Sequence, residues 1–108
     1  MRVHCRHGDE MLAHRTAHPI HYETGGPAAL AGVNVRPLDG ARGQFDAAAV
    51  HEGVRPPGRY SPRSRLLWVE QTSNLGGGSV WPLERIASAW SKRDGATASR
   101  RTWTAPAS

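Results

Sequence analysis

The chain has 108 residues, enough for one domain at most, and its 38% hydrophobic and 21% charged residues are ordinary for a globular protein. It contains no apolar run of about 18 residues and no apolar segment of a secretory signal, so we expect no membrane partner. The net charge is +5, but the arginines that supply it form no stripe with interleaved aromatic side chains. We therefore expect no nucleic-acid partner, and keep a small basic nucleic-acid-binding protein as the rival from another class.

Hydrophobic periodicity predicts that strands and helices alternate along the first half of the chain. Residues 9–14 are a candidate strand, and residues 33–38 alternate in the manner of a second one. Between them, residues 22–32 suit a helix around Pro27–Leu30 that Gly32 closes. The segment around Pro19 is predicted to be a strand end and a loop.

The second half of the chain continues this alternation. Asp46 is predicted to cap a short helix that runs through Val50 and ends at Gly53. A loop rich in proline and arginine, residues 55–62, then leads to residues 64–71. Four consecutive apolar residues within that last segment indicate a strand buried on both faces of a sheet.

The last predicted helix follows a glycine-rich loop at residues 72–79 and has Pro82 in its first turn, where a helix tolerates proline. One face of this helix is predicted to meet the core, since its apolar residues recur at helical spacing: Leu83, Ile86, Ala87 and Trp90. The β-α-β-α-β-α order predicts the α/β class with a mainly parallel sheet. Three such strands are a slice of a domain rather than a whole one.

Three blocks of sequence resemble the motifs of one enzyme family. Residues 8–10 read G-D-E and residues 18–26 read H-P-I-H-Y-E-T-G-G; residues 29–38 read A-L-A-G-V-N-V-R-P-L. The third block begins P-R-S-R-L-L-W-V-E-Q-T-S-N at residue 62 and ends G-G-S-V-W-P-L-E at residue 84. In order and spacing the blocks resemble the L-threonine aldolases, in the β-eliminating lyase group of fold-type I pyridoxal-phosphate enzymes. Any one block is weak, but together they are specific.

This resemblance implies that residues 1–95 are part of the large domain of a fold-type I enzyme that binds pyridoxal 5′-phosphate. It implies an aldehyde-lyase that cleaves a β-hydroxy-α-amino acid to glycine and an aldehyde, in a homo-oligomer with active sites between subunits. His18 matches the histidine that the family packs against the pyridine ring, so we expect it to bind the cofactor by stacking. Without the motif, a histidine after a strand is more often a solvated loop residue.

Two positions depart from the family's pattern. The family's E-N-T-H-N is E-Q-T-S-N at residues 70–74, which puts Ser73 in place of a histidine. Tyr60 stands where the family often has another histidine, near the β-hydroxyl of the substrate. A phenol can hydrogen-bond that oxygen but is a poor base near neutral pH. Tyr60 is therefore a candidate substrate contact, weighed against ordinary loop packing, and a related β-eliminating lyase is the rival activity.

Other patterns suggest sites that we do not expect. His14, His18 and His21 have a spacing that can share a metal ion on a helix, but the predicted loop and the lack of a completing cysteine or carboxylate argue against one. The glycines at residues 76–78 lack the following Lys-Ser/Thr of a phosphate-binding loop and are expected to permit close backbone packing. Cys5, the single cysteine, is expected to be a passive apolar residue, and its lack of a partner fits a reducing cytoplasm.

The lysine content argues against activity of this chain by itself. A pyridoxal-phosphate enzyme of this class needs a Schiff-base lysine. Lys92 is the only lysine, and it lies in the polar end of the last predicted helix, with no match to the family's lysine motif. We therefore expect Lys92 not to bind the cofactor and the chain alone to be inactive.

The tail is predicted to come from a shifted reading frame. The family's next motif, H-x-D-G-A-R, is absent from the chain as written. When the last nucleotide of each codon joins the first two of the next, residues 101–108 can re-read as H-L-D-G-A-R-L; the junction of Trp103 and Thr104 must read GAC, an Asp codon. We expect a frame slip near residues 94–95, a disordered tail at residues 96–108, and family segments missing on both sides of the chain.

Overall fold

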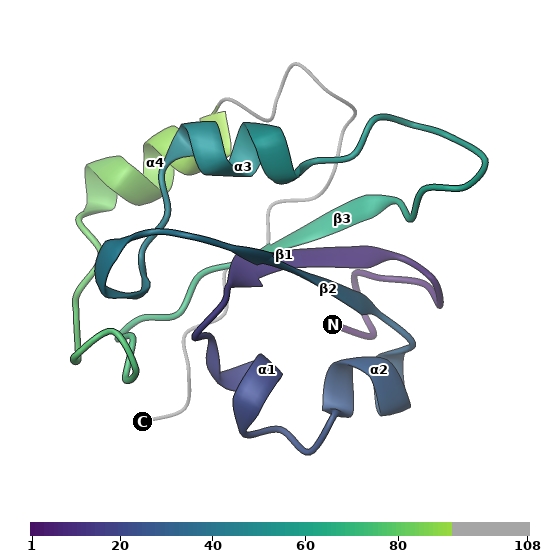
Figure 1. Ribbon diagram of the computed structural model, residues 1–108, viewed down its shortest axis with the longest axis horizontal. Helices are drawn as coiled ribbons and strands as arrows, with labels where there is room; N and C mark the ends of the chain where they lie inside the picture. The colour runs from purple at the N-terminus through teal and green to yellow at the C-terminus, as the bar shows by residue number, and fades with distance from the viewer. Residues whose placement is uncertain (92–108) are drawn as a thin grey trace.

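The computed structural model describes residues 1–91, so the predicted tail at residues 96–108 lies outside the described residues. Three parallel strands form one sheet in the order β2-β1-β3: β1 (Glu10–His14) is central, β2 (Asn34–Leu38) lies on one side and β3 (Ser64–Trp68) on the other. Figure 1 shows this sheet as the middle layer of the molecule. The predicted α/β class with a parallel sheet is confirmed.

Helices cover both faces of the sheet. On one face lie α1 (His18–His21) and α2 (Gly26–Ala31). On the other lie α3 (Ala47–Gly53) and α4 (Leu83–Ser91), and a 3-10 turn, η1 (Ala41–Gly43), follows β2. In Figure 1 the first pair of helices lies below the sheet and the second pair above it. No helix within residues 1–91 is long and apolar enough to cross a membrane.

The central strand divides the hydrophobic core into two halves. All five residues of β1 are buried, and successive side chains point to opposite faces. Met11 and Ala13 pack with the α1–α2 side, and Leu12 packs with the α3–α4 side. In β3, Leu66 and Leu67 divide between the two halves in the same way. The predicted burial of this strand on both faces is thus confirmed; each buried leucine stabilises the fold by about 1.5–3 kcal/mol.

Two local signals in the sequence are confirmed at helix ends. The Asp46 side chain accepts a hydrogen bond from the Ala49 backbone N–H at 2.8 Å, so it caps α3 as predicted. Gly32 follows α2 in the left-handed conformation at φ 62°, where glycine is favoured. A Cβ at Gly32 would also lie 2.7 Å from the His7 ring, so this turn packs closely on the segment before β1.

Two predicted boundaries are wrong. The helix expected around Pro27–Leu30 is confirmed as Gly26–Ala31, but it does not reach back to residue 22, because Thr24 and Gly25 have positive φ values of 52° and 69° that interrupt a right-handed helix. The strand expected through residue 71 ends at Trp68, which pairs with Ala13 one residue before β1 itself ends. The chain leaves the sheet after Trp68, although β1 continues to His14.

Two other expectations about helices are also corrected. The segment around Pro19, expected to be a loop, forms the short helix α1, because proline fits the first turn of a helix. In α4 the buried face differs from the predicted one: Leu83 is 77% exposed and Ala87 is also exposed, whereas Ile86 and Ala89 are buried. Helical spacing predicted the helix correctly. The face of α4 that is buried depends on its contact with α3 and does not include all four predicted apolar residues. The Trp90 side chain lies outside the described part of the structure.

The outer edge of β2 lacks a hydrogen-bond donor at one position. The Asn34 N–H donates to the Asp9 carbonyl, and the Leu38 carbonyl accepts from the Arg15 N–H, so both residues face β1. Because backbone groups alternate in direction along a strand, Pro37 faces the open edge, where it has no N–H to offer. Proline at such a position discourages another strand from pairing there.

Candidate functional site

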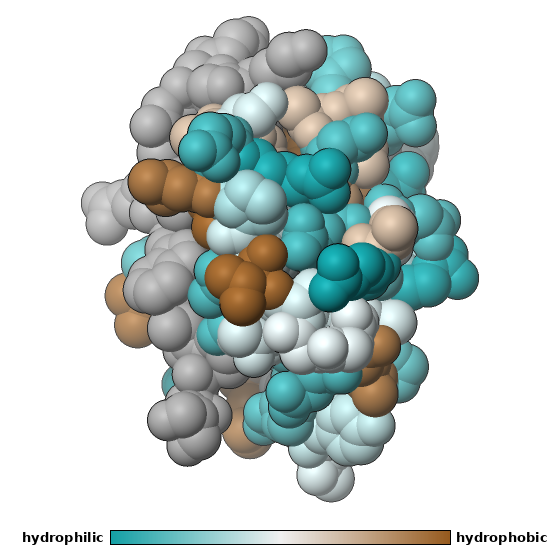
Figure 2. All heavy atoms as spheres, turned by 90° about the vertical axis from the view of Figure 1, so that its left-hand side faces the viewer, coloured by the Kyte–Doolittle hydropathy of each residue, from teal (hydrophilic) through white to brown (hydrophobic). Residues whose placement is uncertain are grey.

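The side chains that could bind a ligand or take part in catalysis lie close together where the parallel strands end. The chain leaves the carboxyl end of β1 through a tight turn into α1, and Glu70 follows the carboxyl end of β3. Figure 2 views the molecule from this side and shows a mainly hydrophilic face with separate hydrophobic side chains. In open parallel sheets, ligands bind outside the carboxyl ends of the strands. A ligand site is therefore expected at this end of the strands.

His18, the predicted cofactor residue, is held from two sides at this edge. Its backbone N–H donates to Oε1 of Glu70 at 2.7 Å, and its Nε2 lies 3.1 Å from Oε1 of Glu23. The ring centroid lies 5.2 Å from that of Tyr22, with the ring planes tilted by 35°. The His18 side chain is nevertheless 44% exposed. Its backbone is fixed while part of its ring stays open to a ligand.

His14 locks the turn that leads to His18. Its Nδ1 accepts from the backbone N–H of Thr16 at 3.1 Å, and its Nε2 lies 2.7 Å from the carbonyl oxygen of Gly40. Its Nδ1 also lies 2.8 Å from Oγ1 of Thr16, a hydroxyl that can donate or accept. His14 is buried and ties the exit of β1 to the exit of β2.

The three histidines considered for a metal turn to different partners. His14 contacts Gly40, His18 contacts Glu23, and Nε2 of His21 lies 2.7 Å from the carbonyl oxygen of Arg15. Among residues 1–91 no group of three or more histidine, cysteine or acidic side chains has the geometry to hold a metal ion.

Tyr60, the candidate substrate contact, and His18 lie at opposite ends of the strands. Tyr60 belongs to the loop before β3, is 88% exposed, and has the Arg59 guanidinium 5.4 Å from its ring centroid. Because the strands are parallel, this loop adjoins their amino ends, whereas His18 follows a carboxyl end. In Figure 1 the loop projects to the right of the strands, and β1 leads into α1 from its left end. The structure does not bring Tyr60 and His18 together within one chain.

The glycine-rich loop after β3 packs tightly against η1. A Cβ at Gly76 would lie 2.1 Å from the Arg42 carbonyl oxygen, and one at Gly43 would lie 1.9 Å from Oγ of Ser73. Ser73 itself is 1% exposed, and its hydroxyl has no hydrogen-bond partner among the described residues. Gly76 permits close backbone packing, as predicted, whereas Gly77 and Gly78 have positive φ values and open space where a Cβ would be. Ser73, at the position where the L-threonine aldolases have a histidine, is thus buried in this chain.

Two ion pairs at the amino ends of the strands were not predicted from the sequence. Arg63 donates to both carboxylate oxygens of Asp9, at 3.1 and 2.9 Å, and Arg55 donates to both oxygens of Glu10, at 2.9 and 3.1 Å. The only signal in the sequence is that Asp9, Glu10 and Arg63 occur in two of the family-like blocks. The Asp9–Arg63 pair joins those blocks, and the Glu10–Arg55 pair joins the first block to the loop before β3.

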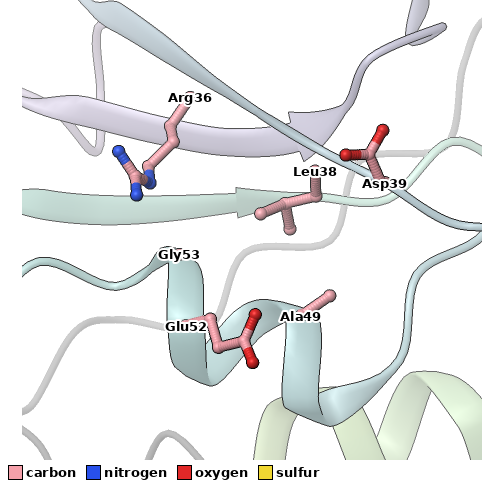
Figure 3. A pocket seen from close by; sticks show the side chains of 6 residues that line it. All are labelled: Arg36, Leu38, Asp39, Ala49, Glu52 and Gly53. Atoms are coloured by element: carbon pink, nitrogen blue, oxygen red, sulfur yellow. The ribbon is translucent and has the colours of Figure 1, made fainter.

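Two further features lie away from His18. A hollow of about 190 Å³ lies beside β2 and α3 and is lined by Arg36, Leu38, Asp39, Ala49, Glu52 and Gly53. Figure 3 shows the Leu38 side chain projecting toward α3, with charged groups around it. Cys5 is buried, and its burial raises the pKa of the thiol, with the Asp9 carboxylate adding to the effect. Both causes suppress the thiolate, which agrees with a passive role for Cys5.

The fold and this edge define an α/β protein of the kind that places its ligand at the carboxyl ends of parallel strands. A sequence model of the β-eliminating lyase family matches residues 1–97. The chain belongs to this family, whose members generally depend on pyridoxal phosphate. The resemblance inferred from the three sequence blocks is thereby confirmed.

Known proteins agree with this assignment. The low specificity L-threonine aldolase of Escherichia coli strain K12 is 33% identical over 88 residues, which are 81% of this chain and 26% of that protein. An uncharacterized protein of Caenorhabditis elegans is 30% identical over 87 residues, covering 80% of this chain and 21% of its own length. The chain thus spans about a quarter of the length of the curated relatives it matches.

A solved structure shows the same fold. Threonine aldolase from Leishmania major superposes with a TM-score of 0.77 at 15% identity, over 87% of this chain and 27% of that one. The three-stranded parallel sheet with its helices therefore corresponds to part of a fold-type I domain, as expected from the sequence.

Proposed function

We propose that this chain carries the cofactor-facing segment of a pyridoxal-phosphate-dependent aldehyde-lyase resembling L-threonine aldolase. The parent enzyme cleaves a β-hydroxy-α-amino acid to glycine and an aldehyde. The observation that carries the proposal is the position of His18, at the carboxyl end of the central strand with a fixed backbone and a ring that is 44% exposed. The identity with the E. coli threonine aldolases supports the reaction class.

The residues present fit one face of the cofactor. When bound, pyridoxal phosphate supplies an electron sink for the substrate's bonding electrons. His18 offers a flat, polarisable ring for stacking, and Glu23 holds Nε2 at the edge of that ring. The Tyr22 ring beside it, 57% exposed, extends the aromatic surface. These side chains hold and orient the cofactor; none of them replaces the lysine of the enzyme class.

We propose that the chain alone is inactive. Lys92, the only lysine, lies outside the described residues and matches no lysine motif of the family. Residues 1–95 are part of a large domain, and residues 96–108 are a tail read in a different frame. The family match extends over residues 1–97, two residues beyond this boundary.

The parent enzyme is proposed to be a cytoplasmic homo-oligomer with sites between subunits. Such an assembly is required if Tyr60 contacts substrate, because Tyr60 and His18 lie at opposite ends of the strands. Tyr60 then serves a neighbouring subunit's site. A β-eliminating reaction is the second candidate, favoured by the family description and by a phenol in place of an imidazole at residue 60.

The stacking role is tested with pyridoxine 5′-phosphate, which has the cofactor's ring and phosphate but no aldehyde to react with amines. Its affinity for the 108-residue chain is measured by equilibrium dialysis. His18→Ala should weaken binding about fivefold, the equivalent of about 1 kcal/mol of ring contact. His51→Ala, an exposed histidine on α3 across the sheet, is the matched control and should bind as the wild type does. Equal weakening by both substitutions contradicts the proposal.

A further inference from the structure

Glu70 is a buried carboxylate that contacts the residue proposed to stack on the cofactor. It is 7% exposed and lies two residues beyond the end of β3. Its Oε1 accepts the backbone N–H of His18 at 2.7 Å, although the two residues are 52 positions apart in the chain. Burying a carboxylate costs free energy unless hydrogen bonds satisfy it, and the His18 N–H supplies such a hydrogen bond.

Helix α1 lacks a cap from its own segment. Its N-cap residue is Ala17, which is 1% exposed and provides no side-chain hydrogen bond in the described structure. The helix has only four residues, far fewer than a helix needs to be stable by itself. The Glu70 carboxylate, placed at the N-terminal end, satisfies a free N–H and complements the positive end of the helix.

We infer that Glu70 is a positioning residue, which caps α1 from the end of β3 and thereby sets where the His18 ring lies. The inference rests on the proposed stacking role of His18. Two carboxylates hold this residue in different ways, since Glu70 fixes the backbone of His18 and Glu23 contacts the edge of its ring at 3.1 Å. These two contacts come from two of the family-like blocks, which thus meet at one residue.

The cap is tested by amide hydrogen exchange of residue 18 in the 108-residue chain, with the Met11 amide of β1 as reference for an intact fold. Glu70→Ala should speed exchange at residue 18 roughly tenfold, because a hydrogen bond to a charged group is lost. Glu70→Gln, whose side-chain oxygen still accepts, should stay close to wild type. Should Glu70→Ala fail to fold, a scalar coupling across the hydrogen bond, from the His18 amide nitrogen to the Glu70 carboxyl carbon, decides the question in the wild type.

The positioning role is tested by the affinity for pyridoxine 5′-phosphate. Glu70→Ala should weaken binding several-fold and Glu70→Gln should not, whereas Glu70→Ala added to His18→Ala should have no further effect. Unchanged exchange at residue 18 in Glu70→Ala overturns the cap. Faster exchange with unchanged affinity overturns the positioning role. Equal affinity of the wild type and His18→Ala overturns the stacking proposal itself, and in His18→Ala the amide of residue 18 still reports on the cap.

Discussion

Asp9 and Arg63 form a bidentate ion pair across 54 positions of the chain. Nε of Arg63 lies 3.1 Å from Oδ1 of Asp9, and one terminal guanidinium nitrogen lies 2.9 Å from Oδ2. The Asp9 carboxylate is 8% exposed and also accepts the backbone N–H of Arg6 at 2.8 Å. The pair joins the amino ends of β1 and β3, whereas His18 lies beyond the carboxyl end of β1. The pair supports the strand that carries the site.

This pair predicts a loss of stability in acid. The hydrogen bonds from Arg63 hold the pKa of Asp9 below its ordinary value of 3.8, against the opposing effect of burial. A lowered folded-state pKa stabilises the fold above the unfolded-state value, and that stability is lost as pH falls from about 4 through the folded value. Urea unfolding followed by tryptophan fluorescence should show this decline in the free energy of unfolding.

Asp9→Asn should lower the free energy of unfolding at pH 7 by roughly 1–2 kcal/mol and flatten its decline below pH 4. Asp39→Asn is the matched control, since its ion pair with Arg15 is exposed on both sides and contributes little. A decline in acid that is equally steep with and without Asp9 would show that another group is responsible.

The packing of the glycine-rich loop predicts a strong effect at one glycine. Gly76→Ala should destabilise the chain by about 1–3 kcal/mol, because the new methyl group meets the Arg42 carbonyl, a backbone atom that cannot swing aside. Gly58→Ala is the control: its Cβ would meet nothing closer than 3.6 Å, in an exposed loop. Thermal unfolding of both variants compares them, and equal melting temperatures would contradict the close approach.

The sheet edges predict a difference in self-association. Pro37→Val restores an N–H donor on the outer edge of β2, so light scattering should rise faster than for the wild type at equal concentration. Pro57→Val, in the exposed loop before β3, should leave the rate unchanged. If both substitutions accelerate aggregation equally, proline slows aggregation by restricting the unfolded chain and not by blocking strand pairing at the edge of β2.

The tail predicts a specific nucleotide sequence. The bases encoding residues 101–108, read one frame over, should encode H-L-D-G-A-R-L, followed downstream by a family-like Ser-Lys segment; upstream of Met1 a Ser-Gly-Thr turn should appear. Sequencing of the locus checks this directly. A locus with no lysine segment in any frame within a few hundred bases refutes the shifted frame.

The restored enzyme would also separate the two candidate reactions. Release of glycine from a β-hydroxy-α-amino acid indicates aldol cleavage, and loss of a β-substituent without glycine release indicates β-elimination.

The fold class was predictable because strand burial and helix capping are local signals. Leu66 and Leu67 lie within one apolar run, and Asp46 stands three residues before the N–H that it caps. Helix bounds were harder, since the left-handed backbone at Thr24 is not encoded by residue type alone. The buried face of α4 depends on where α3 lies, which periodicity within one helix does not contain.

The site was predictable only in part. His18 was found through its motif, whereas its contact with Glu70 joins residues 52 positions apart and follows from strand pairing. The separation of Tyr60 from His18 is likewise a property of the parallel sheet. A motif makes each residue a candidate for an active site but does not indicate that the two would serve the same one.

The central claim is that His18 stacks on the ring of the cofactor. The most direct measurement is an intermolecular nuclear Overhauser effect between the ring protons of pyridoxine 5′-phosphate and assigned side-chain protons of the 108-residue chain. The account predicts cross-peaks from the probe to the imidazole protons of His18 and the ring of Tyr22, and none to His51. Cross-peaks confined to the α3 side of the sheet, or none at His18 with the probe bound, would contradict it.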